Sequence, residues 1–317
     1  MVFVMDAQVF NNLAPKLASA TGVPPPRVGD WRTRRTNAKR DLDAVARTLP
    51  PIRGITVKDY SLTVDEGIDV RLSLYRRSDT DQPGSAVLYL HGGGMIIGWH
   101  RVHDAFVRAY VAASGVPMLA VDYRLAPEYR HPVPVEDCYA GLVWLSDRAA
   151  DLGVDPSRIT VMGDSAGGGL AAGVALLARD RGGPTLAQQL LIFPMLDDRT
   201  VDTDPQLLPF LTWTYDDNAT GWGALLGEQA GGAKVSPYAA PARAEDLSGL
   251  PAAYIEVGEL DIFRDEDLLY ARRLMAAGVP TEFHLHPGCP HLFDAHAPAA
   301  DVSRRALSDR VRRLKSV

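Results

Sequence analysis

The chain of 317 residues has few cysteines, no long apolar stretch and no excess of positive charge, and each shortage excludes a class of protein. Its two cysteines, Cys138 and Cys289, cannot form the disulfide framework of a small secreted domain or complete a zinc site alone. The longest apolar run, at 166–178, is too short to span a membrane. A formal net charge of −6 argues against a nucleic-acid partner, whose phosphates require a positive surface.

The first residues give no indication of export. Residues 1–6 carry no positive charge and already reach an acid at Asp6, whereas a secretory signal starts with a positive segment before its apolar core. Together with the scarcity of cysteine, this predicts a cytoplasmic protein without a metal site.

Short apolar segments alternate with helical patterns over most of the chain. The segments 55–64 and 68–75 alternate in polarity around turn residues and predict an antiparallel hairpin. Further strands are predicted at 86–90, 117–121, 159–162, 189–193, 252–257 and 281–286. Helices are predicted at 103–113, 135–150, 166–179, 263–277 and 302–314. Because crossover helices join parallel neighbours, the pattern predicts an α/β fold with an eight-stranded, mostly parallel, doubly wound sheet.

Two segments do not fit this alternation. Residues 1–50 are polar and helical, and their cluster of basic residues, at 32, 34, 35, 39 and 40, is interpreted as a solvated helix face rather than an anion-binding patch. Residues 197–236 carry several aromatic residues but no clear strand, and a loop of this length is usually functional. We therefore predict a cap built from 1–50 and an insertion at about 197–236, over a core that spans 51–317.

The pattern Gly-Asp-Ser-Ala-Gly, centred on Ser165, lies between a predicted strand and a predicted helix. The bare pattern is weak evidence, but in this context it predicts a sharp turn that exposes a nucleophilic serine. Neighbours without side chains allow the strand and the helix to approach closely, and the amino end of the helix favours negative charge at the serine. Ser165 is therefore the candidate nucleophile.

A run of glycines closes another predicted strand. His91-Gly92-Gly93-Gly94 is a rarer pattern than the serine turn, and glycine amides at the end of a strand can point at a ligand atom. We expect the amides of Gly92, Gly93 and Ala166 to bind the oxyanion of a tetrahedral intermediate. A phosphate-binding loop is the competing interpretation, but the lysine that it needs is absent. His91 is expected to fix this loop rather than to act as a base.

A serine hydroxyl needs a neighbouring base, and the chain has eight histidines. His284 and His286 lie inside the last predicted strand and share a face, which is typical of a structural role. His291 lies beyond that strand in a loop, where the base of such a sheet is expected. We predict His291 as the base, with His286 as the alternative.

The base in turn needs a carboxylate to hold its tautomer. The predicted strand 252–257 ends in Gly-Glu-Leu-Asp, and Asp261 is far enough past the strand to reach the following loop, with Glu259 as the alternative. The acids at 265, 266 and 267 are expected to cap or solvate the next helix. The order Ser165, Asp261, His291 is that of the α/β-hydrolase arrangement.

On these motifs the chain resembles the hormone-sensitive-lipase-like group of α/β-hydrolase esterases. The resemblance rests on residues 91–94, 163–168, the Tyr-Arg-Leu-Ala-Pro-Glu segment 123–128, Asp261 with the acids that follow it, and His-Leu-Phe at 291–293. It implies hydrolysis of carboxylic esters, mostly with short to medium acyl chains and without a cofactor. It also implies a helical cap over the core, a structural turn at 123–128 and homodimerisation through the last strand, at 281–286.

The chain departs from the family pattern next to the expected site. The family commonly has glycine after the base histidine, where this chain has Leu292, and an aromatic residue after the three glycines, where this chain has Met95. Its Asp-Pro-Leu pattern is here Asp261-Ile-Phe. None of these changes touches a reacting group, but Met95, Leu292 and Phe293 are placed to reshape the acyl pocket.

The sequence as a whole therefore predicts an esterase that uses Ser165, His291 and Asp261 and passes through an acyl-enzyme. An amidase or a lactonase would use the same residues, and a non-catalytic binding module on the same fold is the alternative from another class. Aromatic residues predicted to line an apolar substrate pocket for a small ester are Trp99, Phe210, Trp213, Trp222 and Phe293.

Overall fold

The computed structural model describes residues 4–20, 25–48, 52–78 and 84–317, so the boundary predicted between residues 50 and 51 lies outside the described residues. The described part forms an eight-stranded sheet with the strand order β1-β2-β4-β3-β5-β6-β7-β8. The strands are β1 (Ile55–Thr63), β2 (Asp69–Arg77), β3 (Gly84–Leu90), β4 (Met118–Asp122), β5 (Val154–Asp164), β6 (Gln188–Ile192), β7 (Ala252–Gly258) and β8 (Thr281–His286). All eight predicted strands are confirmed.

The pairing of the strands follows from how they are connected. β1 and β2 form the predicted antiparallel hairpin, joined through a 3₁₀ turn at Asp65–Gly67, and β2 also pairs with β4 antiparallel. The other neighbours pair in parallel. β5 is the strand that differs most from its prediction: it already begins at Val154, which pairs with Gly84 across a register shift.

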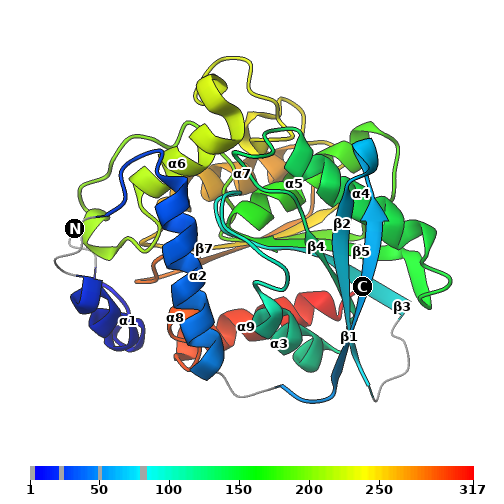
Figure 1. Cartoon of the computed structure of the whole chain (residues 1–317), viewed down its shortest axis with the longest axis horizontal. Coiled ribbons are helices and arrows are strands. Elements are labelled where there is room, and N and C mark those ends of the chain that lie inside the picture. Colours follow the sequence, from blue (N-terminus) through cyan, green and yellow to red (C-terminus); the bar gives the residue numbers. More distant parts are fainter. Residues whose placement is uncertain (1–3, 21–24, 49–51, 79–83) are drawn as a thin grey trace.

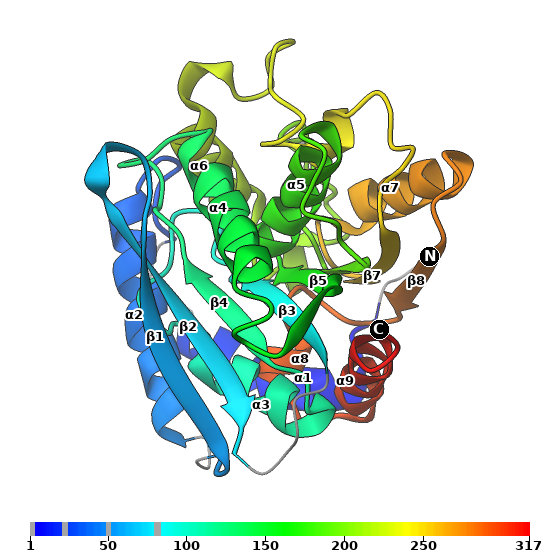
Figure 2. The ribbon, with the colours of Figure 1, turned by 90° about the vertical axis from the view of Figure 1, so that its right-hand side faces the viewer.

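Helices cover both faces of the sheet, which is the doubly wound arrangement. Figure 2 shows α4 (Val133–Asp147), α5 (Ala166–Asp180) and α7 (Arg264–Ala276) on one face. It shows α3 (Asp104–Ser114) and α9 (Asp301–Leu314) on the other. Because both faces are covered, β6 is buried at every position, including its two glutamines.

Helix α5 lies closest to the sheet, and its composition explains why. It is buried from Ala166 to Ala178, a stretch made almost entirely of glycine, alanine, leucine and valine. Small residues allow its axis to approach β5 and β3. The amino end of this helix is thereby fixed at the carboxyl end of the central strands.

Two further helices lie outside this layered arrangement, in the segments predicted to form a cap. Figure 1 shows α2 (Trp31–Thr48), in blue, beginning beside α6 (Tyr215–Leu226). The α6 helix lies within the segment predicted as the cap insertion, although no bounds were predicted for it. Thr214 begins it with a capping box, in which the Thr214 side chain and the backbone and side chain of Asp217 bind one another. The remaining helices are α1 (Ala7–Ala20) and the short α8 (Phe293–His296). Within the described ranges, every helix is too short or too polar to cross a bilayer.

Candidate active site

Ser165 lies at the turn between β5 and α5, in a conformation that L-residues rarely adopt. Its φ of 55° and ψ of −123° confirm the predicted strained turn, and such a backbone costs on the order of 1–3 kcal/mol. The glycines around it are required by packing: a Cβ on Gly167 would lie 2.0 Å from the carbonyl oxygen of Leu90. The turn therefore holds the Ser165 side chain at the carboxyl edge of the sheet.

The structure brings Ser165, His291 and Asp261 together although they are far apart in the chain. The Ser165 Oγ lies 3.0 Å from the His291 Nε2, and the His291 Nδ1 lies 2.6 Å from the Asp261 Oδ2. All three side chains are almost completely buried. The short contact to a carboxylate places the proton on Nδ1, which leaves Nε2 with a lone pair directed at the serine hydroxyl.

Packing and hydrogen bonds fix the ring of His291. The rings of Phe193 and Phe263 meet it edge-on, with centroids 4.9 and 5.2 Å away. The Thr212 hydroxyl donates to the His291 carbonyl at 2.6 Å. The Oδ1 of Asp261 accepts from the Phe263 amide, so the carboxylate is held as well. The geometry is thus set by the ends of β6 and β7 and by the segment before α6.

The alternatives weighed for the base and the acid lie elsewhere. His286 is directed at the buried Glu256, with its Nε2 3.7 Å from the Glu256 Oε2. Its ring is stacked with that of His284, which confirms that the two share a face of β8. Glu259 accepts from the Gly288 amide at 2.8 Å and so braces the loop that carries His291.

The glycine loop after β3 lies beside Ser165 and is held rigidly. The Gly93 carbonyl accepts from the amides of Ile96 and Ile97, and the Tyr123 hydroxyl donates to the His91 carbonyl at 2.8 Å. In the part of the chain that the structure describes, the amides of Gly92, Gly93 and Ala166 have no acceptor. These three donors remain available to a ligand oxygen near Ser165.

His91 has the structural position expected of it. Its Nδ1 donates to the Gly92 carbonyl at 2.8 Å, and its ring stacks on Tyr123 at a centroid distance of 4.3 Å. Burial, together with the nearby His103, lowers the pKa of His91 to about 4. A ring that stays neutral with its Nδ1 engaged fixes the loop and does not act as a base near neutral pH.

A cavity of about 390 Å³ opens onto Ser165 and His291. Its walls come from the ends of β3, β5 and β6 and from helices α2, α3, α6, α8 and α9. The apolar part of its lining includes Leu42, Ile97, Phe106, Ile192, Phe193 and Trp213. Its size lies within the range of about 300–1,000 Å³ that small-molecule sites occupy.

Only one of the five aromatic residues predicted for the pocket, Trp213, lines this cavity. The prediction is wrong for the other four. Trp222 and Phe293 are buried in the core, and Phe210 packs against the small core around α1 and α8. Trp99 lies beneath the ammonium group of Lys39. A large aromatic ring stabilises a core as well as a pocket, so its residue type does not distinguish the two.

The basic cluster of α2 is not simply a solvated face, which corrects the sequence interpretation. Arg34 is buried and pairs with Asp217 of α6 at 2.6 Å. Arg35 pairs with Glu128 at 2.7 Å and donates from its Nε to the Ile96 carbonyl, in the glycine loop. These contacts fix α2 over the cavity, which it lines with Arg34, Asn37, Ala38, Asp41 and Leu42.

Asp164, directly before the serine, is a site residue that the sequence analysis missed. Its Oδ1 accepts from the Tyr89 hydroxyl at 2.5 Å and lies 3.4 Å from the Nδ1 of His103. Burial raises the pKa of Asp164, but His103 and the Tyr89 hydroxyl outweigh burial and hold it below its usual value. An anion is therefore built in beside the nucleophile. The sequence pattern Gly-x-Ser-x-Gly does not single out Asp164, because its second position accepts any residue.

The acids after Asp261 were expected to cap or solvate α7, and for two of them this is wrong. Glu266 is buried and accepts from the amides of Leu196 and Asp197, at 2.6 and 3.1 Å. Asp267 is fully buried, and burial beside Glu266 raises its pKa well above the usual value. Only Asp265 is exposed as expected.

Glu266 braces the segment after β6, in which the Met195 amide donates to the Ser165 carbonyl. We expect Glu266→Ala to lower the free energy of unfolding by about 2–4 kcal/mol, because it leaves a buried and a half-buried amide without an acceptor. Urea denaturation measures this loss. Asp265→Ala is the matched control, with an expected change within about 0.5 kcal/mol because its side chain is exposed. Equal effects of the two substitutions would contradict the assigned role of Glu266.

Two of the family departures lie at strained positions. Leu292 has a φ of 58° and Met95 a φ of 56°, both in the left-handed region that favours glycine. Leu292 lines the cavity beside His291, whereas Met95 and Phe293 are buried in the core. Of the three residues expected to reshape the pocket, Leu292 alone contacts it directly.

Neither cysteine belongs to the site. Both thiols are buried and free, and burial raises the pKa of Cys289 to about 12, so it stays a protonated thiol near neutral pH. No group of three or more histidine, cysteine or acidic side chains within the described ranges is arranged to hold a metal ion.

The chain is similar to known proteins of one fold family. Residues 87–295 match a family model described as the alpha/beta hydrolase fold. The carboxylesterase NlhH of Mycobacterium tuberculosis is 36% identical over 276 residues, which cover 85% of either chain. The solved structure of a hyperthermophilic esterase from the archaeon Pyrobaculum calidifontis is similar with a TM-score of 0.86 and 33% identity, over 99% of both chains. A bacterial heroin esterase has a TM-score of 0.84 and 37% identity, over 96% of this chain and 98% of its own.

Proposed function

Because the chain belongs to the alpha/beta-hydrolase fold family, in its hormone-sensitive-lipase-like group, and is a carboxylic ester hydrolase, we propose that Ser165, His291 and Asp261 carry out the hydrolysis through an acyl-enzyme. The observation that carries the proposal is the chain of two contacts from Asp261 through His291 to the Ser165 hydroxyl. This arrangement increases the nucleophilicity of a hydroxyl that is unreactive alone.

In the first half of the reaction, the Ser165 Oγ attacks the carbonyl carbon of the ester while its proton passes to the His291 Nε2. The carboxylate of Asp261 stabilises the imidazolium that forms. The carbonyl oxygen becomes an oxyanion, which accepts hydrogen bonds from the amides of Gly92, Gly93 and Ala166. The tetrahedral intermediate then collapses: the bond to the alkoxy oxygen breaks, and His291 gives its proton to the departing alcohol.

In the second half, water repeats the cycle on the acyl-enzyme. His291 removes a proton from the water as its oxygen attacks the acyl carbon, and the same amides bind the new oxyanion. The bond to Ser165 breaks, the serine recovers its proton from His291, and the carboxylic acid leaves. The cavity of about 390 Å³ is at the small end of ligand sites, which supports short to medium acyl chains as substrates.

The experiment that tests the proposal is a comparison of two carboxylates on one loop. Asp261→Asn should lower kcat for p-nitrophenyl butyrate by about 10⁴-fold, because an amide in place of the carboxylate favours the wrong histidine tautomer. Glu259→Gln is the control, since its amide oxygen can still accept from Gly288, and its kcat should change by no more than a few-fold. A larger loss in Glu259→Gln than in Asp261→Asn would contradict the proposed triad.

A further inference from the structure

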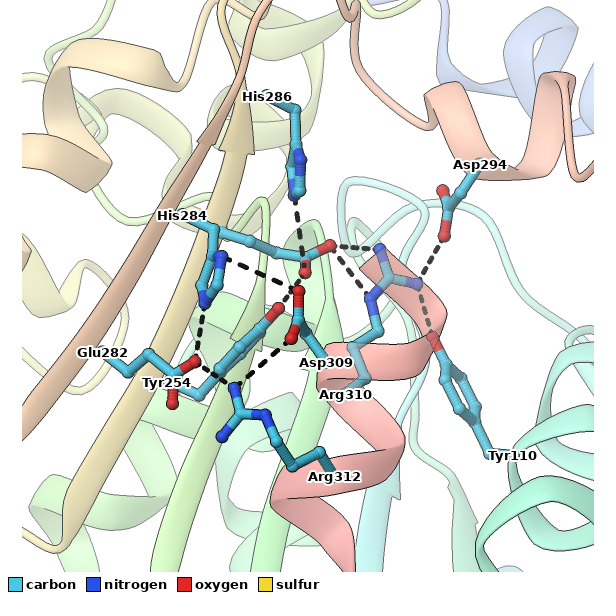
Figure 3. Close-up of polar contacts among 10 residues, drawn as sticks. Tyr110, Tyr254, Glu282, His284, His286, Asp294, Asp309, Arg310 and Arg312 are labelled. Atoms are coloured by element: carbon cyan, nitrogen blue, oxygen red, sulfur yellow. Dashed lines mark hydrogen bonds and ion pairs between the residues drawn. The ribbon is translucent and has the colours of Figure 1, made fainter. Parts of the chain in front are cut away.

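One of the polar clusters that line the cavity opening onto Ser165 comes from the three helices α3, α8 and α9. Tyr110 of α3, Asp294 of α8 and Arg310 of α9 all line it, and the Nη1 of Arg310 contacts both of the others. Figure 3 shows Tyr110 and Asp294 reaching this guanidinium group from two directions. We call these three residues the polar end of the cavity.

Arg310 cannot serve as a free cation for a ligand, because its guanidinium group is already neutralised. Its Nε donates to the Oε1 of Glu256 at 2.9 Å, its Nη2 contacts the same oxygen, and its Nη1 pairs with Asp294. Although burial alone would raise it, Arg310 lowers the pKa of Glu256 to about 2, so Glu256 is an anion. With Glu256 behind it and Asp294 beside it, Arg310 has no unpaired positive charge to offer to a ligand carboxylate.

Tyr110 presents a hydrogen-bond donor to the cavity. Its hydroxyl oxygen accepts from the Arg310 Nη1 at 2.7 Å, and we find no acceptor for the hydroxyl proton in the described part of the chain. A neighbouring cation makes a hydroxyl a stronger donor. Tyr254, on the opposite side of Glu256, has no hydroxyl proton to offer to a ligand, because its hydroxyl donates to the Glu256 Oε2 at 2.5 Å. Tyr254 also does not line the cavity.

Asp294 adds an acceptor beside this donor. One of its oxygens accepts from the Ala295 amide at 3.0 Å and the other pairs with Arg310, but each carboxylate oxygen has two acceptor sites. Its side chain is 17% exposed, compared with 2% for that of Arg310, so it remains accessible from the cavity. A donor and an acceptor thus lie on either side of one guanidinium group.

From this arrangement we infer that the polar end of the cavity recognises a hydroxyl group on the acyl chain of the substrate, so that esters of hydroxy acids are preferred. A hydroxyl accepts from Tyr110 and donates to Asp294 at the same time. A methyl group leaves both without a partner, and an ammonium group cannot accept from Tyr110. Phe106, Phe193 and Ile192 would contact the apolar part of the same chain.

This inference rests on the proposed function and is tested with matched esters. The substrates are ethyl esters of ω-hydroxy acids with three to eight carbons and ethyl alkanoates one carbon longer, because a hydroxyl and a methyl group are similar in size. Hydrolysis is followed in a pH-stat. At one or two chain lengths we expect kcat/KM for the hydroxy ester to be about tenfold higher, as two net hydrogen bonds would give.

Variants of two tyrosines identify the source of the preference. Tyr110→Phe should reduce the ratio of the two kcat/KM values from about ten to about three, because it removes one of the two hydrogen bonds. Tyr254→Phe, in the same network but outside the cavity, should retain the full ratio. Should Tyr110→Phe fail to fold, the substrate series of the unmodified protein decides alone.

Three outcomes overturn the inference: a methyl group favoured at every chain length, a preference that is undiminished in Tyr110→Phe, or one that is reduced equally in Tyr254→Phe. If the alkanoates are hydrolysed through Ser165 without any hydroxyl preference, only this inference fails. If no ester is hydrolysed and Ser165 is inert towards acylating reagents, the proposed function fails with it.

Discussion

Replacing Ser165 with alanine is expected to lower kcat for p-nitrophenyl butyrate by about 10⁶-fold, as removal of a triad nucleophile does. Without the Oγ, no acyl-enzyme can form, and only direct attack by water beside the oxyanion donors remains. The loss should appear in kcat, because the cavity that binds the ester is intact. Steady-state kinetics at saturating substrate measure it.

The control for this variant is an exposed serine on the same strand. Ser157 lies in β5, where its hydroxyl donates to the Asp155 carboxylate. Ser157→Ala should retain full activity, and both variants should unfold at nearly the same temperature as the unmodified protein. Turnover by Ser165→Ala within a hundredfold of the original would show that a different nucleophile is used.

The second large effect is expected for His291→Asn, which removes the base and should also lower kcat by about 10⁶-fold. Loss of the base and loss of the nucleophile have nearly equal effects because the two act as a unit. The double variant Ser165→Ala/His291→Asn should therefore be no slower than either single variant. A double variant whose loss equals the product of the single losses would contradict this coupling.

His286→Asn is the matched control for the base. Its ring lies near Glu256 rather than near Ser165, so we expect kcat within a few-fold of the original. If His286→Asn abolished activity while His291→Asn preserved it, the base would have to be assigned to β8 instead of the loop that follows it.

The arrangement of strands could be predicted because local patterns determine it. The eight strands are short apolar runs separated by helical patterns, and parallel pairing follows from the crossover helices that join them. The strained turn at Ser165 was also predictable, because only glycine-rich neighbours allow a helix to pack so close to a strand. These features depend on residues close together in the sequence.

Features that depend on residues far apart in the sequence could not be predicted. Arg34 and Arg35 were interpreted as solvated because a basic helix face usually is, and their acid partners lie in other elements. Glu266 was expected to cap or solvate α7, because nothing near it in the sequence reveals the amides that it binds.

The cavity lining shows the same limit. Trp222 and Phe293 have the residue type of a pocket wall but lie in the core, whereas Leu42, Phe106 and Tyr110 line the cavity without any motif. Side chains from several helices meet there only after folding. Their contribution to substrate choice can be read from the structure and not from local patterns.

The most direct test of the account is the covalent reaction of the folded protein with a fluorophosphonate, followed by peptide mass mapping. We expect one adduct per chain, on Ser165, and none on the His291→Asn variant under the same conditions. An unlabelled Ser165 in folded protein, or an adduct on a different residue, would contradict the assignment of Ser165 as the activated nucleophile.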